Sequence, residues 1–365
     1  MTSRSLAAVV LAAGEGRRMR SDRPKPLHLL CGRPLLLYVV DTLADLPVDR
    51  VVVVVGAAAE LVTKRILRDV DGTLVDFVEQ PVPRGTADAV HAALAVLPED
   101  DLGDDDVLVV PVDMPLLSTA SLRRLVETHR SGDAACTVLT VRRAEPAGFP
   151  RVVRGRDDWI VRLVAEPDAL ADEWSIEEVS VSVFCARRSL LGAAIRRLTP
   201  ADDGGYRLED VVEVLARAGH RIAAVEVGEI GEVAEVDDRV RLAEVEAELR
   251  RRINHAWLAA GVSMLDPATC YVDATVQLGR DVTLFPGTLL QGRTVIGAGA
   301  EIGPNVRLVD CVVGEGVRVQ HTVGIDAEIG DDAVVGPFVA LEAGARVEAG
   351  QRVVAGTTVR LTDPI

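Results

Sequence analysis

The sequence predicts an α/β domain with a mostly parallel, Rossmann-like sheet, followed by a helical linker and a short left-handed parallel β-helix. Up to about Gly228, apolar β-branched runs alternate with helix-like segments, as in βαβ units with helices on both faces of a sheet. Beyond Asp273, short β-branched strands recur with glycines in step, often at multiples of six residues, which is the periodicity of hexapeptide-repeat β-helices. The length of 365 residues also favours two domains over one core.

The individual elements follow from their apolar patterns. Strands of the first domain are expected at residues 7–11, 51–55, 107–112 and 136–141, and helices at 87–97 and 120–130. A long amphipathic helix is expected at 239–258, where apolar residues recur at three and four positions. We therefore place the first domain at residues 1–238, the helical linker at 239–262 and the β-helix at 263–365.

Composition restricts the function. The chain is 48% hydrophobic, and its formal net charge of -16 opposes binding to nucleic acid or to an anionic membrane. Its apolar stretches fall short of the roughly 20 residues of a membrane helix. Residues 1–5 lack the apolar region of a secretory signal, so we expect a cytoplasmic location. Five scattered cysteines without metal-site spacing are expected to be free, mostly buried thiols.

The sharpest motif, LAAGEGRRM followed by PKPL, comes directly after the first expected strand. A glycine-rich turn lets backbone N–H groups approach a polyphosphate, and Arg18 and Lys25 supply the positive charge that a reacting triphosphate needs. We expect Arg18 and Lys25 to be catalytic. The expected nucleotide-binding residues of the turn are Leu11, Ala12, Ala13, Gly14 and Gly16.

This string resembles the signature of the sugar-1-phosphate nucleotidyltransferase family, and within it most closely the bacterial N-acetylglucosamine-1-phosphate uridylyltransferases. The segment QPVPRGTADAV resembles the part of that family that reads the base, which implies nucleotide-binding roles for Gln80, Gly85 and Thr86. An amide side chain and a backbone amide can satisfy the edge of a pyrimidine, so the resemblance implies uracil or thymine more than a purine.

The resemblance also implies a magnesium site. Asp113 ends the hydrophobic segment VLVVPVD, and carboxylates at strand ends of open α/β sheets lie where ligands bind. The family uses this Asp to hold Mg²⁺. Its second ligand aligns with Asp237 in EVAEVDDR, where the family usually has Asn; Asp is also an oxygen ligand. We expect both residues to bind the metal.

The implied reaction joins a nucleoside triphosphate, UTP or dTTP favoured, to a sugar 1-phosphate and releases pyrophosphate. A phosphate oxygen of the acceptor attacks the α-phosphorus in line, so the protein supplies charge neutralisation and alignment and no nucleophilic side chain. The substrates expected as partners are therefore these two small phosphorylated molecules.

The acceptor side departs from the family pattern. The family's Gly-Tyr-Gly-Arg appears as GFPR, its Glu-Ile-Asn-Thr-Gly appears as EVSVS, and Ala165 stands where a sugar-binding Glu is expected, unless Glu166 replaces it. The candidate residues for the sugar pocket are Gly148, Glu166 and Ser180. Lost hydrogen bonds to an N-acetyl sugar leave a different hexose or a cyclitol 1-phosphate open as the acceptor, and this alternative also leaves another nucleoside triphosphate open as the donor.

In bifunctional members of the family the β-helix carries an acetyltransferase site. The segment bearing the catalytic His is not matched here, so acetyltransferase activity is expected to be absent. Solenoids of this kind bury apolar faces against copies of themselves, which favours a homotrimer. The alternative from another class is a binding or scaffold protein that keeps the fold without turnover; altered acceptor-side residues favour it, and Arg18, Lys25 and Asp113 favour the enzyme.

Overall fold

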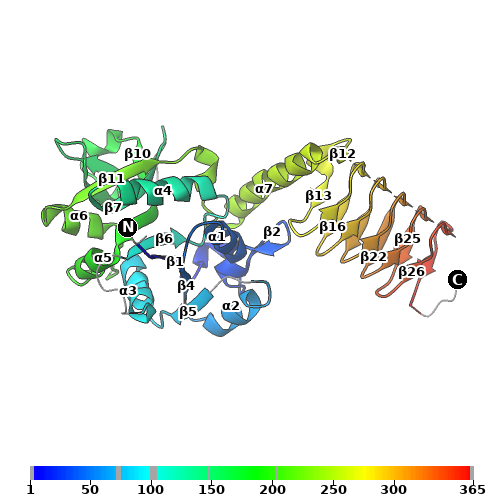
Figure 1. Cartoon of the computed structure of the whole chain (residues 1–365), viewed down its shortest axis with the longest axis horizontal. Helices are drawn as coiled ribbons and strands as arrows, with labels where there is room; N and C mark the ends of the chain where they lie inside the picture. Colours follow the sequence, from blue (N-terminus) through cyan, green and yellow to red (C-terminus); the bar gives the residue numbers. More distant parts are fainter. Residues whose placement is uncertain (1–3, 71–74, 99–104, 147, 203, 362–365) are drawn as a thin grey trace. The chain divides into compact units, whose positions relative to one another are not determined.

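The computed structural model describes residues 4–70, 75–98, 105–146, 148–202 and 204–361. The chain divides into two compact units, Met1–His28 with Pro34–Arg241 and Leu29–Arg33 with Leu242–Ile365. The first is an α/β unit and the second is built of stacked parallel strands, as in a left-handed β-helix (Figure 1). The predicted fold class is thereby confirmed.

The first unit is organised around a nine-stranded sheet. β10 runs antiparallel to both of its long neighbours, and the other strands along the main path are parallel to one another. β8 and β9 form an antiparallel extension beside β10. The main order is β11 (Arg221–Glu226), β7 (Ala134–Arg142), β10 (Glu178–Arg187), β6 (Asp106–Pro111), β1 (Leu6–Ala12), β4 (Arg50–Val55) and β5 (Val75–Glu79), with β8 at Arg151–Arg154 and β9 at Ile160–Val164.

Helices cover both faces of the sheet, as the burial of its valine-rich strands shows. Side chains alternate across a strand, so consecutive valines face opposite sides. Val9 lies in one apolar cluster and Val10 in the other, and Val52 and Val53 divide in the same way. Both faces are therefore buried. The helices are α1 (Leu35–Ala44), α2 (Ala59–Ile66), α3 (Thr86–Val96), α4 (Thr119–Ser131), α5 (Arg188–Ile195) and α6 (Asp210–Arg217).

A buried carboxylate lies at the amino end of β6 with two basic side chains beside it. The side chain of Asp106 has no exposed surface, and its Oδ2 accepts a hydrogen bond of 2.9 Å from Arg130 Nε. His129 Nε2 lies 3.4 Å from Oδ1. Burial alone raises the pKa of Asp106, but the hydrogen bonds from His129 and Arg130 outweigh it and lower the pKa. These contacts therefore depend on an ionised carboxylate.

The second unit begins with a helix and continues as a parallel β-helix. α7 (Arg239–Ala259) starts at the predicted residue and ends one residue beyond the predicted end. Ile296, Ile302 and Leu308 are buried at six-residue steps, and each is the second residue of its short strand and points inward as the repeat predicts. Figure 1 shows these strands stacked as successive rungs.

The rungs form three parallel sheets of short strands. Their strands are β12 (Ser263–Met264), β15 (Thr283–Leu284), β18 (Glu301–Ile302), β21 (Arg318–Val319), β24 (Val334–Val335) and β27 (Arg352–Val353); β13 (Tyr271–Val272), β16 (Leu289–Gln291), β19 (Arg307–Val309), β22 (Thr322–Ile325), β25 (Val339–Leu341) and β28 (Thr358–Val359); and β14 (Gln277–Leu278), β17 (Val295–Ile296), β20 (Val312–Val313), β23 (Glu328–Ile329) and β26 (Arg346–Val347).

A short early segment, Leu29–Arg33, belongs to the second unit. It contains β2 (Leu29–Leu30), and β3 (Arg33–Pro34) begins at its last residue. The carbonyl oxygen of Cys31 accepts a hydrogen bond of 2.9 Å from the Ala274 N–H. Nothing in the sequence pattern of this segment separates it from its neighbours in the first predicted domain, residues 1–238.

Two simpler predictions concern the whole chain. All five cysteines are free and buried, as expected. Within the described ranges, no helix combines the length and the apolar character needed to cross a membrane.

Candidate functional site

The predicted functional residues gather where the parallel strands end. β1, β4, β5, β6, β7 and β11 all run in the same direction, so their carboxyl ends share one edge of the sheet. The glycine-rich turn follows β1, Gln80 follows β5, and Asp113 lies two residues beyond β6. This edge is where open α/β sheets bind ligands.

Lys25 is the centre of the candidate site. It begins the short helix η2 (Lys25–Leu27), and its Nζ lies 2.6 Å from Asp113 Oδ2 and 3.3 Å from Asp237 Oδ1. Arg18 Nη2 lies 3.1 Å from the same Asp237 oxygen. The lysine side chain is 11% exposed and that of Arg18 is 72% exposed. The structure thus brings together four residues that the sequence predicts separately.

Hydrogen bonds fix the segments that carry the two aspartates. The N–H of Val236, next to Asp237, donates to the carbonyl oxygen of Asp113 at 2.9 Å. The buried Glu232 also accepts hydrogen bonds from the Ser118 N–H at 3.2 Å and the Ser118 hydroxyl at 2.7 Å. Because Ser118 caps α4, the segment carrying Asp237 is attached to the start of that helix. The spacing of the carboxylates is therefore set by the fold.

A third carboxylate, Glu235, lies beside this pair. Burial, followed by the negative charges of Asp113 and Asp237, raises the pKa of Glu235 to about 7, against smaller opposing effects of Lys25 and Arg143. The site therefore contains a carboxyl group that is costly to ionise while only protein charges surround it.

Arg143 adds a third cation to the site, from the end of another strand. It directly follows β7, and its guanidinium carbon lies 4.5 Å from the centroid of the buried Phe149 ring. Stacking of this kind holds a guanidinium flat and leaves its N–H edge free. Its guanidinium has no hydrogen bond or ion pair with another residue of the described part of the chain. It is therefore available to an anion.

The glycine-rich turn leaves room on its outer side. Gly14 is exposed, and a Cβ added there meets nothing within 4 Å. Gly16 has a φ of 61°, and a Cβ there would lie 2.9 Å from the Cβ of Lys25. The protein itself therefore requires glycine at Gly16, whereas an approaching ligand explains Gly14 better. Leu11 and Ala12 are the last residues of β1, and Ala13 leads into the turn.

The residues expected to read the base are also together. Gln80 is buried, and its Nε2 donates to the Gly85 carbonyl oxygen at 3.1 Å and to Asp88 Oδ2 at 2.8 Å. Gly85 has a φ of 104°, and a Cβ there would lie 2.4 Å from the Tyr206 carbonyl oxygen. The Thr86 hydroxyl accepts from the Leu208 N–H at 2.9 Å. Gln80 is thus a fixed amide and not a mobile surface side chain.

The acceptor-side candidates divide into two groups. Glu166 Oε2 accepts a hydrogen bond of 2.6 Å from the Gly148 N–H, so these two residues lie together and accessible. Ser180 has no exposed surface, and its hydroxyl oxygen accepts from the Ser182 N–H at 3.2 Å. Ser182 has a φ of 55° at the position where the family has glycine. Ser180 therefore offers no surface to a ligand in this arrangement.

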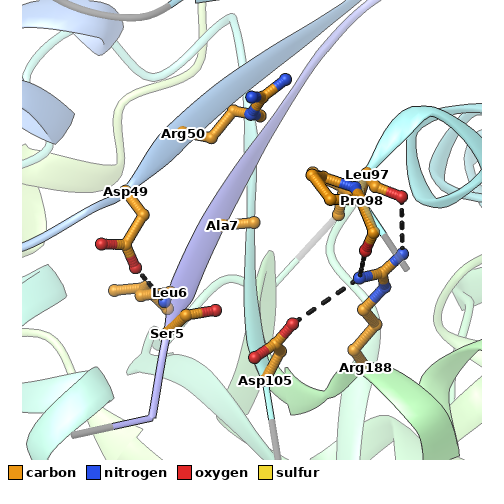
Figure 2. A pocket seen from close by; sticks show the side chains of 9 residues that line it. All are labelled: Ser5, Leu6, Ala7, Asp49, Arg50, Leu97, Pro98, Asp105 and Arg188. Carbon is orange, nitrogen blue, oxygen red and sulfur yellow. Dashed lines mark hydrogen bonds and ion pairs between the residues drawn. The ribbon is translucent and has the colours of Figure 1, made fainter. Parts of the chain in front are cut away.

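A separate pocket lies at the opposite edge of the sheet, at the amino ends of β1 and β4. Figure 2 shows Arg188 pointing to the carbonyl oxygens of Leu97 and Pro98 and to Asp105. The pocket has a volume of about 230 Å³, and the charged side chains that line it are paired within the protein. None of the predicted site residues lines it.

The donor set at the carboxyl edge fits Mg²⁺. The Lys25 ammonium already lies between two carboxylates, which shows that a cation is stabilised there. Within the described ranges, no group of three or more His, Cys, Asp or Glu side chains could hold a metal ion by itself. Mg²⁺ commonly takes one or two carboxylates and completes its shell with water and substrate phosphates, so Asp113 and Asp237 suffice.

Comparison with known proteins decides the family. A model of the MobA-like NTP transferase domain matches residues 8–210. The chain belongs to this family. Among curated members related to it, the bifunctional protein GlmU of Caldanaerobacter subterraneus subsp. tengcongensis is 38% identical over 319 residues, 87% of this chain and 68% of that protein. The bifunctional protein GlmU of Pelotomaculum thermopropionicum is 41% identical over 324 residues, 88% of this chain and 69% of that protein.

A solved structure supports the fold of the NTP transferase unit. The inositol-1-phosphate CTP transferase from T. maritima superimposes with a TM-score of 0.53 over 68% of this chain and 98% of that chain. The two sequences are 17% identical, so the likeness concerns the fold alone.

Three residues of the site were missed by the sequence analysis. Glu235 lies within the same segment as Asp237, EVAEVDDR, so its nearness to the site can be inferred from the sequence. Its burial cannot. Asp88 lies within the base-reading segment, but its contact with Gln80 depends on where α3 begins. Arg143 gave no signal, because it follows a strand that no motif marks.

Proposed function

We propose that this chain catalyses Mg²⁺-dependent transfer of a nucleotidyl group from UTP or dTTP to a sugar 1-phosphate, releasing pyrophosphate. The observation that supports this best is the set of contacts from Lys25 to Asp113 and Asp237, with Arg18 beside them, at the carboxyl edge of the sheet. The set combines two metal-ligating carboxylates with two cations for phosphates.

The residues account for the steps of such a transfer. Backbone N–H groups of the glycine-rich turn and the side chains of Arg18 and Lys25 hold and neutralise the triphosphate. An oxygen of the acceptor's phosphate attacks the α-phosphorus, and the bond between that phosphorus and the bridging oxygen of the leaving pyrophosphate breaks. Bound Mg²⁺ supplies charge that stabilises the phosphates in the transition state. Asp113 and Asp237 are the residues that hold it.

The two aspartates that Lys25 contacts bear on how it could bind a phosphate. In the described contacts its ammonium neutralises both aspartates. Asp113 and Asp237 would hold a divalent cation, whose charge would take over that neutralisation. The Lys25 ammonium would then be available to donate hydrogen bonds to phosphate oxygens.

The acceptor is the less defined substrate. Ser180 is covered and Ala165 has no carboxylate. Glu166 and Gly148 remain accessible among the candidates, but they are hydrogen-bonded to each other. A specific site leaves hydrogen bonds to an N-acetyl group unmade only at a cost. We therefore infer that N-acetylglucosamine 1-phosphate is not clearly the best acceptor, which leaves another hexose or a cyclitol 1-phosphate open as the acceptor.

One experiment tests both substrates. Purified protein with Mg²⁺ is incubated with each of five nucleoside triphosphates and a panel of sugar and cyclitol 1-phosphates, and pyrophosphate release is measured. UTP or dTTP is expected to be the best donor. Strong preference for ATP or GTP contradicts the base assignment, and high activity with N-acetylglucosamine 1-phosphate contradicts the acceptor assignment. No turnover with any pair favours a binding or scaffold protein.

We also infer that the β-helix assembles copies of the chain into a trimer. Val323 and Ile325, both on β22, are 47% and 46% exposed although they are apolar, and Val312 on a neighbouring sheet is 52% exposed. Exposed apolar groups on a solenoid face are buried at little cost against an identical face. Light scattering coupled to size exclusion tests this, and a monomer at micromolar concentration contradicts it.

A further inference from the structure

The amide of Gln80 has a fixed orientation. Its Nε2 carries two hydrogens, and each has an acceptor, the Gly85 carbonyl oxygen at 3.1 Å and Asp88 Oδ2 at 2.8 Å. Both partners are acceptors only, so the reverse orientation of the amide would place oxygen against oxygen. The Oε1 atom is therefore the group that Gln80 can offer to a ligand.

Asp88 is itself held in place. It lies in the first turn of α3 with its side chain 17% exposed, and its Oδ1 accepts a hydrogen bond of 2.9 Å from Arg84 Nη2. A carboxylate is favoured at this end of a helix by the helix dipole. Asp88 therefore presents one oxygen to Arg84 and the other to Gln80.

A donor accompanies the Gln80 acceptor. The Gly85 N–H lies at the start of α3, and it donates to no other residue in the part of the chain that the structure describes. Such N–H groups at a helix start are left without intrahelical partners. The base-reading segment thus offers one acceptor and one donor, and Asp88 determines which atom of Gln80 is the acceptor.

We propose that Asp88 is a positioning residue for base selection, which orients Gln80 so that the site accepts uracil or thymine and rejects cytosine. Uracil and thymine carry a donor at N3 and an acceptor at O4, which match Gln80 Oε1 and the Gly85 N–H. Cytosine carries a lone pair at N3 and an amino donor at C4, so both contacts would oppose like groups. This inference rests on the proposed function, because it assumes that Gln80 faces the base.

Binding of UMP and CMP to the full chain, measured by calorimetry without turnover, tests the proposal. The original chain is expected to prefer UMP by about 100-fold, since sites built for a hydrogen-bond pattern reject the wrong one strongly. Asp88→Ala removes one of the two acceptors and lets the Gln80 amide rotate, so the preference is expected to fall about tenfold or more. Alanine suits a helix, and circular dichroism checks that the variant is folded.

Two further variants separate orientation from a merely structural role. Asp88→Asn keeps one oxygen that can accept from Gln80 but gives up the second oxygen, which accepts from Arg84, so it should retain more of the preference than Asp88→Ala. Arg84→Ala removes only the exposed partner of Asp88 and should leave the preference within about twofold, as surface ion pairs contribute little.

The outcomes distinguish this proposal from the proposed function. The role of Asp88 is overturned if Asp88→Ala loses UMP and CMP binding equally. It is also overturned if the original chain binds the two nucleotides equally or binds neither. A changed preference in a chain that shows no pyrophosphate release with any substrate pair overturns the proposed transfer and supports the role of Asp88 in base binding.

Discussion

Replacing Asp113 by Asn is the most direct test of the proposed metal site. Asparagine has nearly the same shape and retains an oxygen that can accept the hydrogen bond from Lys25, so the change removes mainly a charge. The carboxylate is 21% exposed and its ion pair with Lys25 is partly screened by water. Lys25 also keeps its contact of 3.3 Å with Asp237. Stability without metal is therefore expected to change by about 1 kcal/mol or less.

The loss of function should be much larger. Removing one preorganised electrostatic group commonly lowers kcat by about 10²–10³-fold, and we expect at least this for Asp113→Asn. A tenfold excess of Mg²⁺ over its dissociation constant stabilises the original chain by about 1.4 kcal/mol. That free energy corresponds to a rise in Tm of about 3–6 °C for a domain of this size. The variant should lose this rise.

Pyrophosphate release and thermal unfolding with and without Mg²⁺ measure the two effects. Asp237→Asn is the matched control, because it changes the other aspartate in the same way but restores the residue usual in the family, and it should retain most of the activity. Full activity of Asp113→Asn, or an unchanged Mg²⁺-dependent rise in its Tm, would refute the assignment of Asp113 as a ligand.

Three other variants test separate parts of the first unit. Arg143→Leu removes a guanidinium that is available to an anion, so it should raise the KM for a phosphorylated substrate about tenfold or more with kcat less affected. Arg142→Leu is the control and should leave the KM unchanged, and equal effects of the two variants would contradict a role for Arg143 in binding phosphate. Gly14→Ala should fold normally, because its Cβ meets no atom, yet bind UTP more weakly in a titration. Asp106→Asn should lower the free energy of unfolding by about 3–5 kcal/mol at neutral pH by removing the buried charge that pairs with Arg130. Because the pKa of Asp106 is lowered on folding, its contribution to the free energy of unfolding is present above about pH 4 and is lost as the pH falls through the folded pKa. Urea titrations of the original chain should therefore show a loss of stability on acidification that the variant lacks.

The fold was predictable because its signals are local and repeated. Consecutive valines such as Val52 and Val53 face different cores, so an unbroken apolar run indicates a strand covered on both faces. In the β-helix, Ile296 and Ile302 repeat the same environment one step later. The assignment of Leu29–Arg33 was not predictable, since it depends on hydrogen bonds to residues more than 200 positions away.

The candidate site was predictable only in part. Motifs identify Lys25 and Asp113, and the structure adds that the two are in contact. Burial cannot be read from a motif, which is why Ser180 was a reasonable candidate and yet is covered. The effect of Glu235 depends on the distance between charges brought together by separate loops, and local sequence does not encode that distance.

The membership of Leu29–Arg33 in the second unit has a consequence for interpreting mutations in the β-helix. This segment begins four positions after Lys25 and obtains its order from partners such as Ala274. A substitution that unfolds the β-helix therefore releases the chain just beyond the lysine, although every neighbour of the lysine is unchanged. Loss of transfer activity in such a variant would then follow from the lost attachment of the chain next to Lys25. It would give no evidence that the β-helix binds a substrate.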